Sequence, residues 1–132
     1  MVRAMKSQRA ADFHEWRKQI KALWYALRLV EDTGPCIRRD VAALRRAESW
    51  LGSEHDVGVL CDELSRDAPE GQRRIDRDCV RLVGEPYQSA LRAKALAGTK
   101  RIYAATPREY TNAVRREWKR WHTTTEKRHG AG

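Results

Sequence analysis

Apolar residues recur at every third or fourth position along nearly the whole chain, and the alternation typical of strands is hard to find. That period marks helices that bury one face. Glycine and proline interrupt it at Gly34-Pro35, at Gly52-Ser53, over 69–71, over 84–86 and at Thr106-Pro107. Short connections between helices with single apolar stripes are typical of an antiparallel bundle. We therefore predict an all-α fold, an antiparallel bundle of about five to six helices.

These breaks predict the extent of each helix. The first covers about 5–31, and its apolar stripe consists of Phe13, Trp16, Ile20, Leu23, Trp24, Leu27 and Val30. The second follows Pro35 and ends at Gly52, where a left-handed residue commonly closes a helix. Ser53 then caps a third helix, with Asp56 in the capping-box position. The fourth covers about 70–83, the fifth about 86–105, and the sixth begins at Pro107.

A chain of 132 residues with 41% hydrophobic residues is long enough to bury one core. We predict a single domain over 1–132, with its core over about 5–123 and a polar, flexible tail over about 124–132. The tryptophans fall largely on packing faces, which favours a role in the core over one in base stacking. Cys36, Cys61 and Cys79 include no CxxC pair, so we expect reduced and mostly buried thiols.

Targeting and metal signals are absent from the sequence. No apolar block follows the basic residues near the N-terminus, and no run of about 18 apolar residues could form a membrane span. His122 and His129 have no partners at metal-ligand spacing. The expectation is a cytoplasmic protein with no metal and no cofactor.

The charge balance narrows the class of ligand. Lys and Arg number 27 against 18 Asp and Glu, which gives a formal net charge of +9. Such a surplus concentrates anionic partners near the protein and speeds their association. It does not choose among RNA, DNA, acidic lipid, an acidic protein and polyphosphate.

The predicted first helix carries a separate basic face. At about 100° per residue, an arc of roughly 100° holds His14, Arg17, Lys18, Lys21, Tyr25 and Arg28. Arg offers paired donors to phosphate oxygens, Lys a point charge, and His one or two N–H donors. Because Glu15 and Glu31 lie off this face, we expect the row to lack acidic partners and to be open to an anion.

Later segments carry more positive charge. We group it as a secondary basic surface of Arg73, Arg77, Arg81, Lys94, Lys100, Arg101, Arg116 and Lys119. Acids such as Asp76, Asp78 and Glu117 are interspersed with them. The ordinary interpretation here is a solvated surface with salt bridges.

Two sequence blocks resemble a known family. Residues 14–27, HEWRKQIKALWYAL, resemble the signature of the CHAD family, the conserved histidine α-helical domain, whose pattern is H-x-x-R-[KR]-x-x-K-x-L-x-Y-x-L. Residues 51–60, LGSEHDVGVL, are similar to the family's L-G-x-x-x-D-x-x-V-L. The segment 95–98, and Pro107 leading to Trp118 and Trp121, also fit, so the resemblance covers about residues 9–122.

The resemblance implies non-catalytic binding of inorganic polyphosphate through a basic surface, for targeting or storage, and association with polyphosphate granules in some members. Carried over residue by residue, it implicates His14, Arg17, Lys18, Lys21 and Tyr25. The helical geometry adds Arg28 to this set.

The length departs from the family pattern. CHAD domains are usually longer and contain two similar helical halves, whereas this chain resembles the second half only. It therefore predicts half of a two-bundle architecture: a fragment, a shortened relative, or a homodimer that restores the missing half by symmetry.

Two other function classes compete with polyphosphate binding. A nucleic-acid-binding helical domain is the alternative, although no helix-turn-helix, RNP or zinc-finger pattern occurs. We do not expect an enzyme, because the sequence has no Walker loop, no nucleophile elbow and no E-x-E-x-K motif of the triphosphate tunnel domains that often accompany CHAD domains. His55 and Asp56 suggest a catalytic pair only superficially, and we interpret Asp56 as a capping or helix-pairing residue.

Overall fold

The computed structural model describes residues 7, 9–67 and 73–129. Its regular elements are α2 (Ala10–Arg28), the 3-10 turn η1 (Glu31–Thr33), α3 (Pro35–Asp67), α4 (Arg73–Ala104) and α5 (Pro107–His129). The predicted all-helical fold is confirmed. The predicted count of five to six helices is wrong, because the described part of the chain holds four α-helices.

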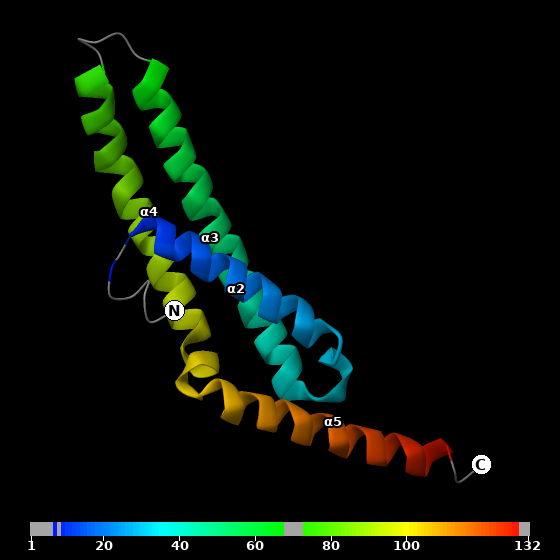
Figure 1. Cartoon of the computed structure of the whole chain (residues 1–132). Coiled ribbons are helices and arrows are strands. Elements are labelled where there is room, and N and C mark those ends of the chain that lie inside the picture. The colour runs from blue at the N-terminus through cyan, green and yellow to red at the C-terminus, as the bar shows by residue number, and fades with distance from the viewer. Residues whose placement is uncertain (1–6, 8, 68–72, 130–132) are drawn as a thin grey trace.

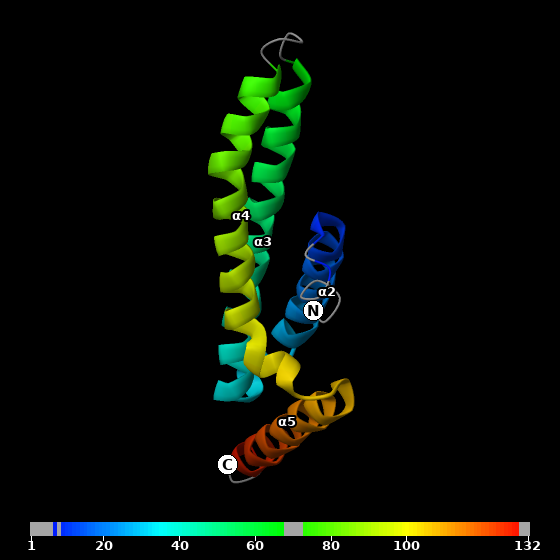
Figure 2. The ribbon, with the colours of Figure 1, turned by 90° about the vertical axis from the view of Figure 1, so that its left-hand side faces the viewer.

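Two long helices form an antiparallel hairpin that dominates the molecule (Figure 1). α2 lies across one face of this hairpin, and α5 leaves the end of α4 and extends away from the other elements (Figures 1 and 2). The half of the hairpin farthest from α5 projects beyond α2.

Gly52 lies inside α3 and not at a helix end, so the predicted second and third helices are one. It is buried where α2 crosses α3, and a Cβ there would lie 3.0 Å from Nη2 of Arg17. The glycine therefore leaves room for the guanidinium of Arg17 over α3, at a cost of about 1 kcal/mol for a glycine in a helix interior. With the helix continuous, Ser53 and Asp56 are mid-helix residues and the predicted capping box does not form.

Pro86 also lies inside a helix, so the predicted fourth and fifth helices are continuous in α4. Proline has no N–H to donate to the preceding turn and usually breaks a helix. Here the helix is held against α3: Gly84 is buried, and a Cβ there would lie 2.9 Å from Sγ of Cys61. Tertiary packing overrides the local preference at this point.

The start of α5 agrees with the prediction. Thr106 and Glu109 form a capping box, in which Glu109 accepts hydrogen bonds from the backbone N–H and hydroxyl of Thr106 at 2.8 Å. These bonds lower the pKa of Glu109. The helix continues to His129, past Thr123, where the sequence predicts the polar tail to begin.

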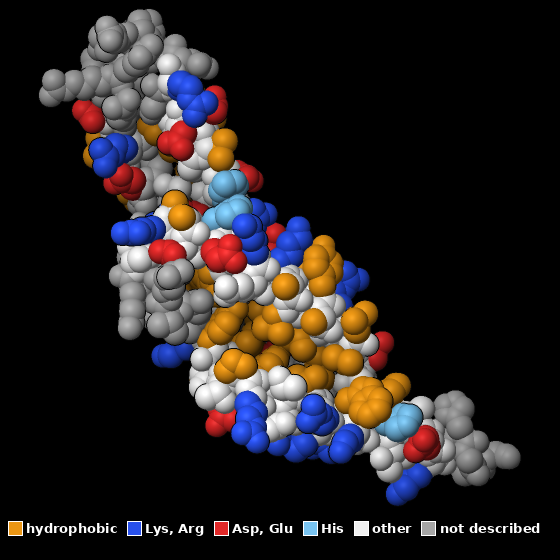
Figure 3. All heavy atoms as spheres, viewed as in Figure 1, with side chains coloured by type: hydrophobic (Ala, Val, Ile, Leu, Met, Phe, Trp, Pro, Cys, Tyr) orange, Lys and Arg blue, Asp and Glu red, His pale blue; other side chains and the backbone are white. Residues whose placement is uncertain are grey.

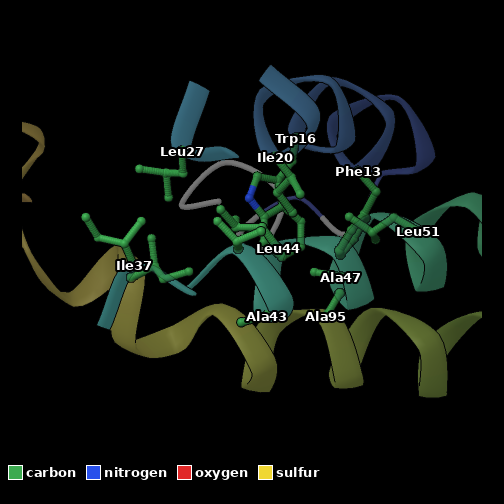
Figure 4. Packing of buried hydrophobic residues seen from close by; sticks show 12 residues of the cluster. Phe13, Trp16, Ile20, Leu27, Ile37, Ala43, Leu44, Ala47, Leu51 and Ala95 are labelled. Atoms are coloured by element: carbon green, nitrogen blue, oxygen red, sulfur yellow. The ribbon is translucent and has the colours of Figure 1, made fainter. Parts of the chain in front are cut away.

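The core lies where α2 crosses the hairpin (Figure 4). Phe13, Trp16, Ile20 and Leu27 point down from α2 onto α3, in agreement with the predicted stripe. The partners that they meet, together with the rest of the cluster, are Ile37, Val41, Ala43, Leu44, Ala47, Leu51, Ala95 and Ile102. Burial of this apolar surface is the main force that holds α2 on the hairpin.

A buried ion pair lies beside this core. Glu54 of α3 is 3% exposed, and its Oε1 accepts hydrogen bonds from Nε of Arg92 at 2.9 Å and from Nε2 of Gln88 at 3.3 Å. The guanidinium of Arg92 also lies 4.6 Å from the centre of the Phe13 ring. One cluster of side chains thus joins α2, α3 and α4.

A second buried carboxylate fixes α5. Asp40 of α3 accepts a hydrogen bond from the hydroxyl of Tyr110 at 2.9 Å and pairs with Arg101 of α4. Burial raises the pKa of Tyr110, which keeps its hydroxyl protonated as a donor. The first turn of α5 is therefore anchored, Val114 still packs on the core, and the second half of the helix extends away from the body (Figure 1).

Some burial predictions are wrong. Of the tryptophans, Trp16 is buried and Trp24 and Trp50 are half-buried, but Trp118 and Trp121 are exposed on the part of α5 that extends away. Cys36 is exposed and Cys61 is half-buried, and the Cys79 side chain lies outside the described residues. Among the helices described, none combines the length and apolar character needed to cross a membrane.

Removing the buried carboxylate should destabilise the whole fold. We expect Glu54→Ala to lower the free energy of unfolding by about 3–5 kcal/mol, because it removes the buried carboxylate that accepts hydrogen bonds from Arg92 and Gln88. The matched control is Glu63→Ala, which removes an exposed pair with Arg66 and should cost at most about 1 kcal/mol. Urea unfolding followed by circular dichroism measures both, and equal losses would contradict a central role for Glu54.

Candidate functional site

The predicted basic face of α2 is on the outside of the molecule. His14, Lys18, Lys21, Tyr25 and Arg28 are exposed, and Arg17 is half-buried. The apolar stripe of α2 packs on α3, so the basic row is turned away from the core. Because α2 rises by about 1.5 Å per residue, the row from His14 to Arg28 is about 21 Å long.

Arg17 has an acidic partner that the sequence did not reveal. Its Nε and Nη2 donate to Oε1 of Glu48 on α3 at 3.2 and 3.1 Å, and its guanidinium lies over Gly52. The expectation of a row without acidic partners is therefore wrong at this position. Lys18 also lies 3.4 Å from Oε2 of Glu15, although both side chains are largely exposed.

The other two cations of the row, Lys21 and Arg28, are not held by an acidic residue among those the structure describes. Within the part of the chain that the structure describes, Lys21 makes no ion pair. Arg28 lies with its guanidinium 5.7 Å from the centre of the Trp24 ring, and Tyr25 stacks on the same indole at 5.0 Å. Trp24 thereby orders the two side chains at the end of the row while leaving both exposed to solvent.

A second histidine joins the row. The rings of His14 on α2 and His55 on α3 lie 5.1 Å apart at a tilt of 38°. The space-filling view shows two adjacent histidine side chains on the surface, with both basic and acidic side chains around them (Figure 3). They line a shallow hollow of about 310 Å³ that also touches Glu54, Gly58 and Gln88.

Imidazoles placed this closely can donate N–H groups to one oxyanion. Two protonated rings repel each other at this distance, and a phosphate between them would remove that repulsion. The arrangement therefore suits an anion better in mild acid, where histidine is charged.

The secondary basic surface does not form one site with this row. Its described members lie on α4 and α5, and two of them are occupied by acids: Arg101 pairs with the buried Asp40, and Arg81 with Glu85 at 2.9 Å. The hydrogen bond from Arg81 to Glu85 raises the pKa of the guanidinium further. Lys94, Lys100, Arg116 and Lys119 are exposed, and among the described residues none of them pairs with an acid. The side chains of Arg73 and Arg77 lie outside the described residues.

Groups of three or more side chains able to hold a metal ion do not occur among the described residues. The hollow beside His14 and His55 contains Asp62 as well, but these three do not form such a group. The chemistry that this surface offers is hydrogen-bond donation and positive charge.

Sequence reasoning missed His55 and Glu48 as neighbours of the row. Both lie on α3, 41 and 31 positions from their α2 partners, and each contact depends on how two helices cross. The one local signal was the glycine between them, Gly52, which permits the close crossing. By local pattern alone this glycine predicts a helix end.

Comparison with known proteins points to the same part of the chain. The family model of the CHAD domain matches residues 1–65, which include all of α2 and nearly all of α3. No curated protein and no solved structure matches the chain.

The two central cations of the row should differ in their structural role. We expect Arg17→Ala to lower the free energy of unfolding by about 1 kcal/mol, because it removes the half-buried pair with Glu48 and the cover over Gly52. Lys21→Ala should change it by less than about 0.5 kcal/mol, as is usual for an exposed side chain. Urea titrations of the two variants test this, and a larger loss at Lys21 would contradict the packing described.

Proposed function

The chain belongs to the CHAD family, and on that premise we propose that it binds inorganic polyphosphate through the basic row of α2 as a targeting or storage module. The observation that carries the proposal is an exposed row of His14, Lys18, Lys21 and Arg28 along one side of a single helix. A linear polyanion can follow such a row, whereas a compact phosphate compound would contact only one part of it.

Binding would be multivalent. Each exposed contact is weak by itself, but a chain ligand that touches several at once gains effective concentration for the rest. Longer chains should bind more tightly, and added salt should weaken binding steeply. Arg17 would contribute through its remaining donors, with Glu48 holding the guanidinium in place.

The proposal is of binding and not of catalysis. The sequence carries no E-x-E-x-K motif, no Walker loop and no nucleophile elbow, and phosphoanhydride hydrolysis commonly needs such groups or clustered metal-binding acids. We place the protein in the cytoplasm as part of the same proposal, with polyphosphate granules as its site of action.

One observation favours a second candidate, binding of nucleic acid. Trp118 and Trp121 are exposed on α5, and the exposed Lys119 and Arg120 lie beside them in the sequence. Exposed aromatic rings among basic residues can stack on the bases of a single strand. The indole of Trp118 is already stacked on His122 at 5.1 Å, however, which leaves one of its faces covered.

The decisive experiment compares the two polyanions on the wild-type chain and on Lys18→Ala/Lys21→Ala. At matched phosphate concentration and physiological ionic strength, we expect clear preference for long-chain polyphosphate over single-stranded DNA. The double variant should lose about tenfold in polyphosphate affinity, or roughly 0.7 kcal/mol for each lysine. Isothermal titration calorimetry or fluorescence anisotropy gives both affinities.

A matched control is Lys94→Ala/Lys100→Ala, which removes the same charge from exposed positions on α4. We expect it to change polyphosphate affinity by less than threefold, the order of a long-range charge effect at this ionic strength. An equal loss in both double variants would show that net charge and not the α2 row governs binding. Stronger binding of DNA than of polyphosphate, unaffected by Lys18→Ala/Lys21→Ala, would favour the second candidate.

The histidine pair gives the binding a pH dependence. Histidine gains its charge between about pH 8 and 6, so polyphosphate affinity should rise over this interval. We expect a rise of about fivefold or more, and we expect His14→Gln/His55→Gln to reduce it to less than twofold, since each charge-assisted contact with phosphate is stronger than a neutral one. The same titrations at three pH values measure it, and a wild-type affinity that stays flat would remove the two histidines from the site.

A further inference from the structure

Two groups of exposed apolar side chains lie on elements at opposite ends of the molecule, the projecting half of the hairpin and α5 (Figures 1 and 2). The first lies on the projecting half of the α3–α4 hairpin and consists of Leu60, Leu64, Val83 and Tyr87; we call it the hairpin strip. The second consists of Trp118 and Trp121 on α5; we call it the tryptophan ridge. Their six side chains are between 40% and 76% exposed.

The hairpin strip lies on one side of the hairpin. Cys61 of α3 and Gly84 of α4 lie at the contact between the two helices. Leu60 comes directly before Cys61 in the sequence, and Val83 comes directly before Gly84. When two antiparallel helices pack side by side, the residues that directly precede the contacting residues face the same side of the helix pair. Residues four positions apart on one helix also face the same side. Leu64 and Tyr87 therefore extend the strip along the hairpin.

α2 covers the other side. Its residues reach α3 at Glu48, Gly52 and His55, which lie around the helix from Leu60 and Leu64. In a helical bundle, further helices normally pack on such a strip and bury it. The projecting half of a two-helix hairpin has no such helix. The four strip side chains are between 50% and 76% exposed, so the described elements outside the hairpin leave most of this surface open to solvent.

The tryptophan ridge continues the apolar stripe of α5. Tyr110 and Val114 at the start of the helix are half-buried against the core, and Trp118 and Trp121 follow at the same helical spacing beyond it. Figure 3 shows apolar side chains running from the body of the molecule out along α5. The exposed half of an apolar stripe of this kind can be buried by packing against another chain.

The charge around each surface indicates which of them can pack on the tryptophan ridge. α5 carries seven Arg or Lys and three Asp or Glu, so two ridges would repel each other. Residues 55–67, which hold the α3 part of the hairpin strip, carry four Asp or Glu and one Arg. Residues 78–87, which hold its α4 part, carry two acids and one Arg, so the strip is flanked by a net negative charge. A basic helix with an apolar ridge and an acidic helix with an apolar strip are complementary in both respects.

We infer that the protein forms a reciprocal homodimer in which the tryptophan ridge of each copy packs on the hairpin strip of the other. Because the two surfaces lie at opposite ends of one chain, a twofold axis can bring both pairs together and close the assembly at two copies. Each contact then occurs twice, which doubles the buried area that a single ridge could provide. The dimer does not depend on polyphosphate binding, since neither surface includes the basic row of α2.

The test measures the mass of the full chain without any polyanion. Sedimentation velocity at tens of micromolar should give a dimer, twice the chain mass of 15.3 kDa. The ridge variant Trp118→Glu/Trp121→Glu and the strip variant Leu64→Glu/Val83→Glu should each raise the dimer dissociation constant at least 100-fold. Leu29→Glu, at a position that is 87% exposed and outside both surfaces, should leave it unchanged within threefold.

Mixing the two variants identifies the pairing. In a mixed dimer the intact ridge of the strip variant meets the intact strip of the ridge variant, so one of the two contacts is restored. The mixture should therefore form a heterodimer more tightly than either variant dimerises alone. Ridge-to-ridge or strip-to-strip dimers would give no such recovery, and this outcome would overturn the proposal, as would a wild-type chain that stays monomeric at about 100 µM.

Arg115→Glu provides a test that leaves every apolar residue in place. Arg115 is exposed near the ridge, and reversing its charge should weaken the dimer about threefold or more if the acidic hairpin faces it. Circular dichroism shows that each variant keeps its helical content. A dimer indifferent to this change and broken only by the tryptophan variant would contradict the charge complementarity on which the pairing is assigned.

Discussion

The carboxylate of Glu54 sets where three helices meet. It is almost fully buried, and a buried charge is tolerated only when its oxygens are bonded. Arg92 and Gln88 supply those bonds from α4, and the guanidinium of Arg92 at the same time lies over the Phe13 ring of α2. If one helix were shifted along another so that these groups separated, the buried carboxylate would lose its partners. The pair therefore fixes the relative positions of α2, α3 and α4 more narrowly than apolar burial would.

This constraint positions the basic surface. With Phe13 held against Arg92, the next residue, His14, comes to lie beside His55, and Arg17 one turn later meets Glu48 over Gly52. The row on α2 is thus built on a rigid crossing of two helices and not on a loop. Preorganised donors lose less conformational entropy on binding a polyanion, which supports the proposed role of this face.

A second consequence follows from the same architecture. Because α2 is shorter than the hairpin it crosses, its cover ends before the hairpin does. α5 is held along its first half, by the Tyr110–Asp40 bond, by Val114 and by the approach of Glu117 to Gly34. Apolar surface remains exposed at both ends of the molecule. The CHAD resemblance left open a fragment, a shortened relative or a homodimer, and the exposed apolar surfaces are where the proposed homodimer would form its contacts.

Local pattern by itself determined the helical class, the apolar stripe of α2, the start of α5 at a Thr-Pro-Arg-Glu capping box, and the separation of basic from apolar positions on α2. These features depend on residues within a few positions of each other, so a single stretch of sequence contains them. The tertiary structure alone decided that Gly52 and Pro86 lie inside helices, that Glu48 holds Arg17, and that His55 joins His14. Each of those outcomes depends on the energy of packing one helix against another, which outweighs local propensity and leaves no mark in the spacing of the residues concerned.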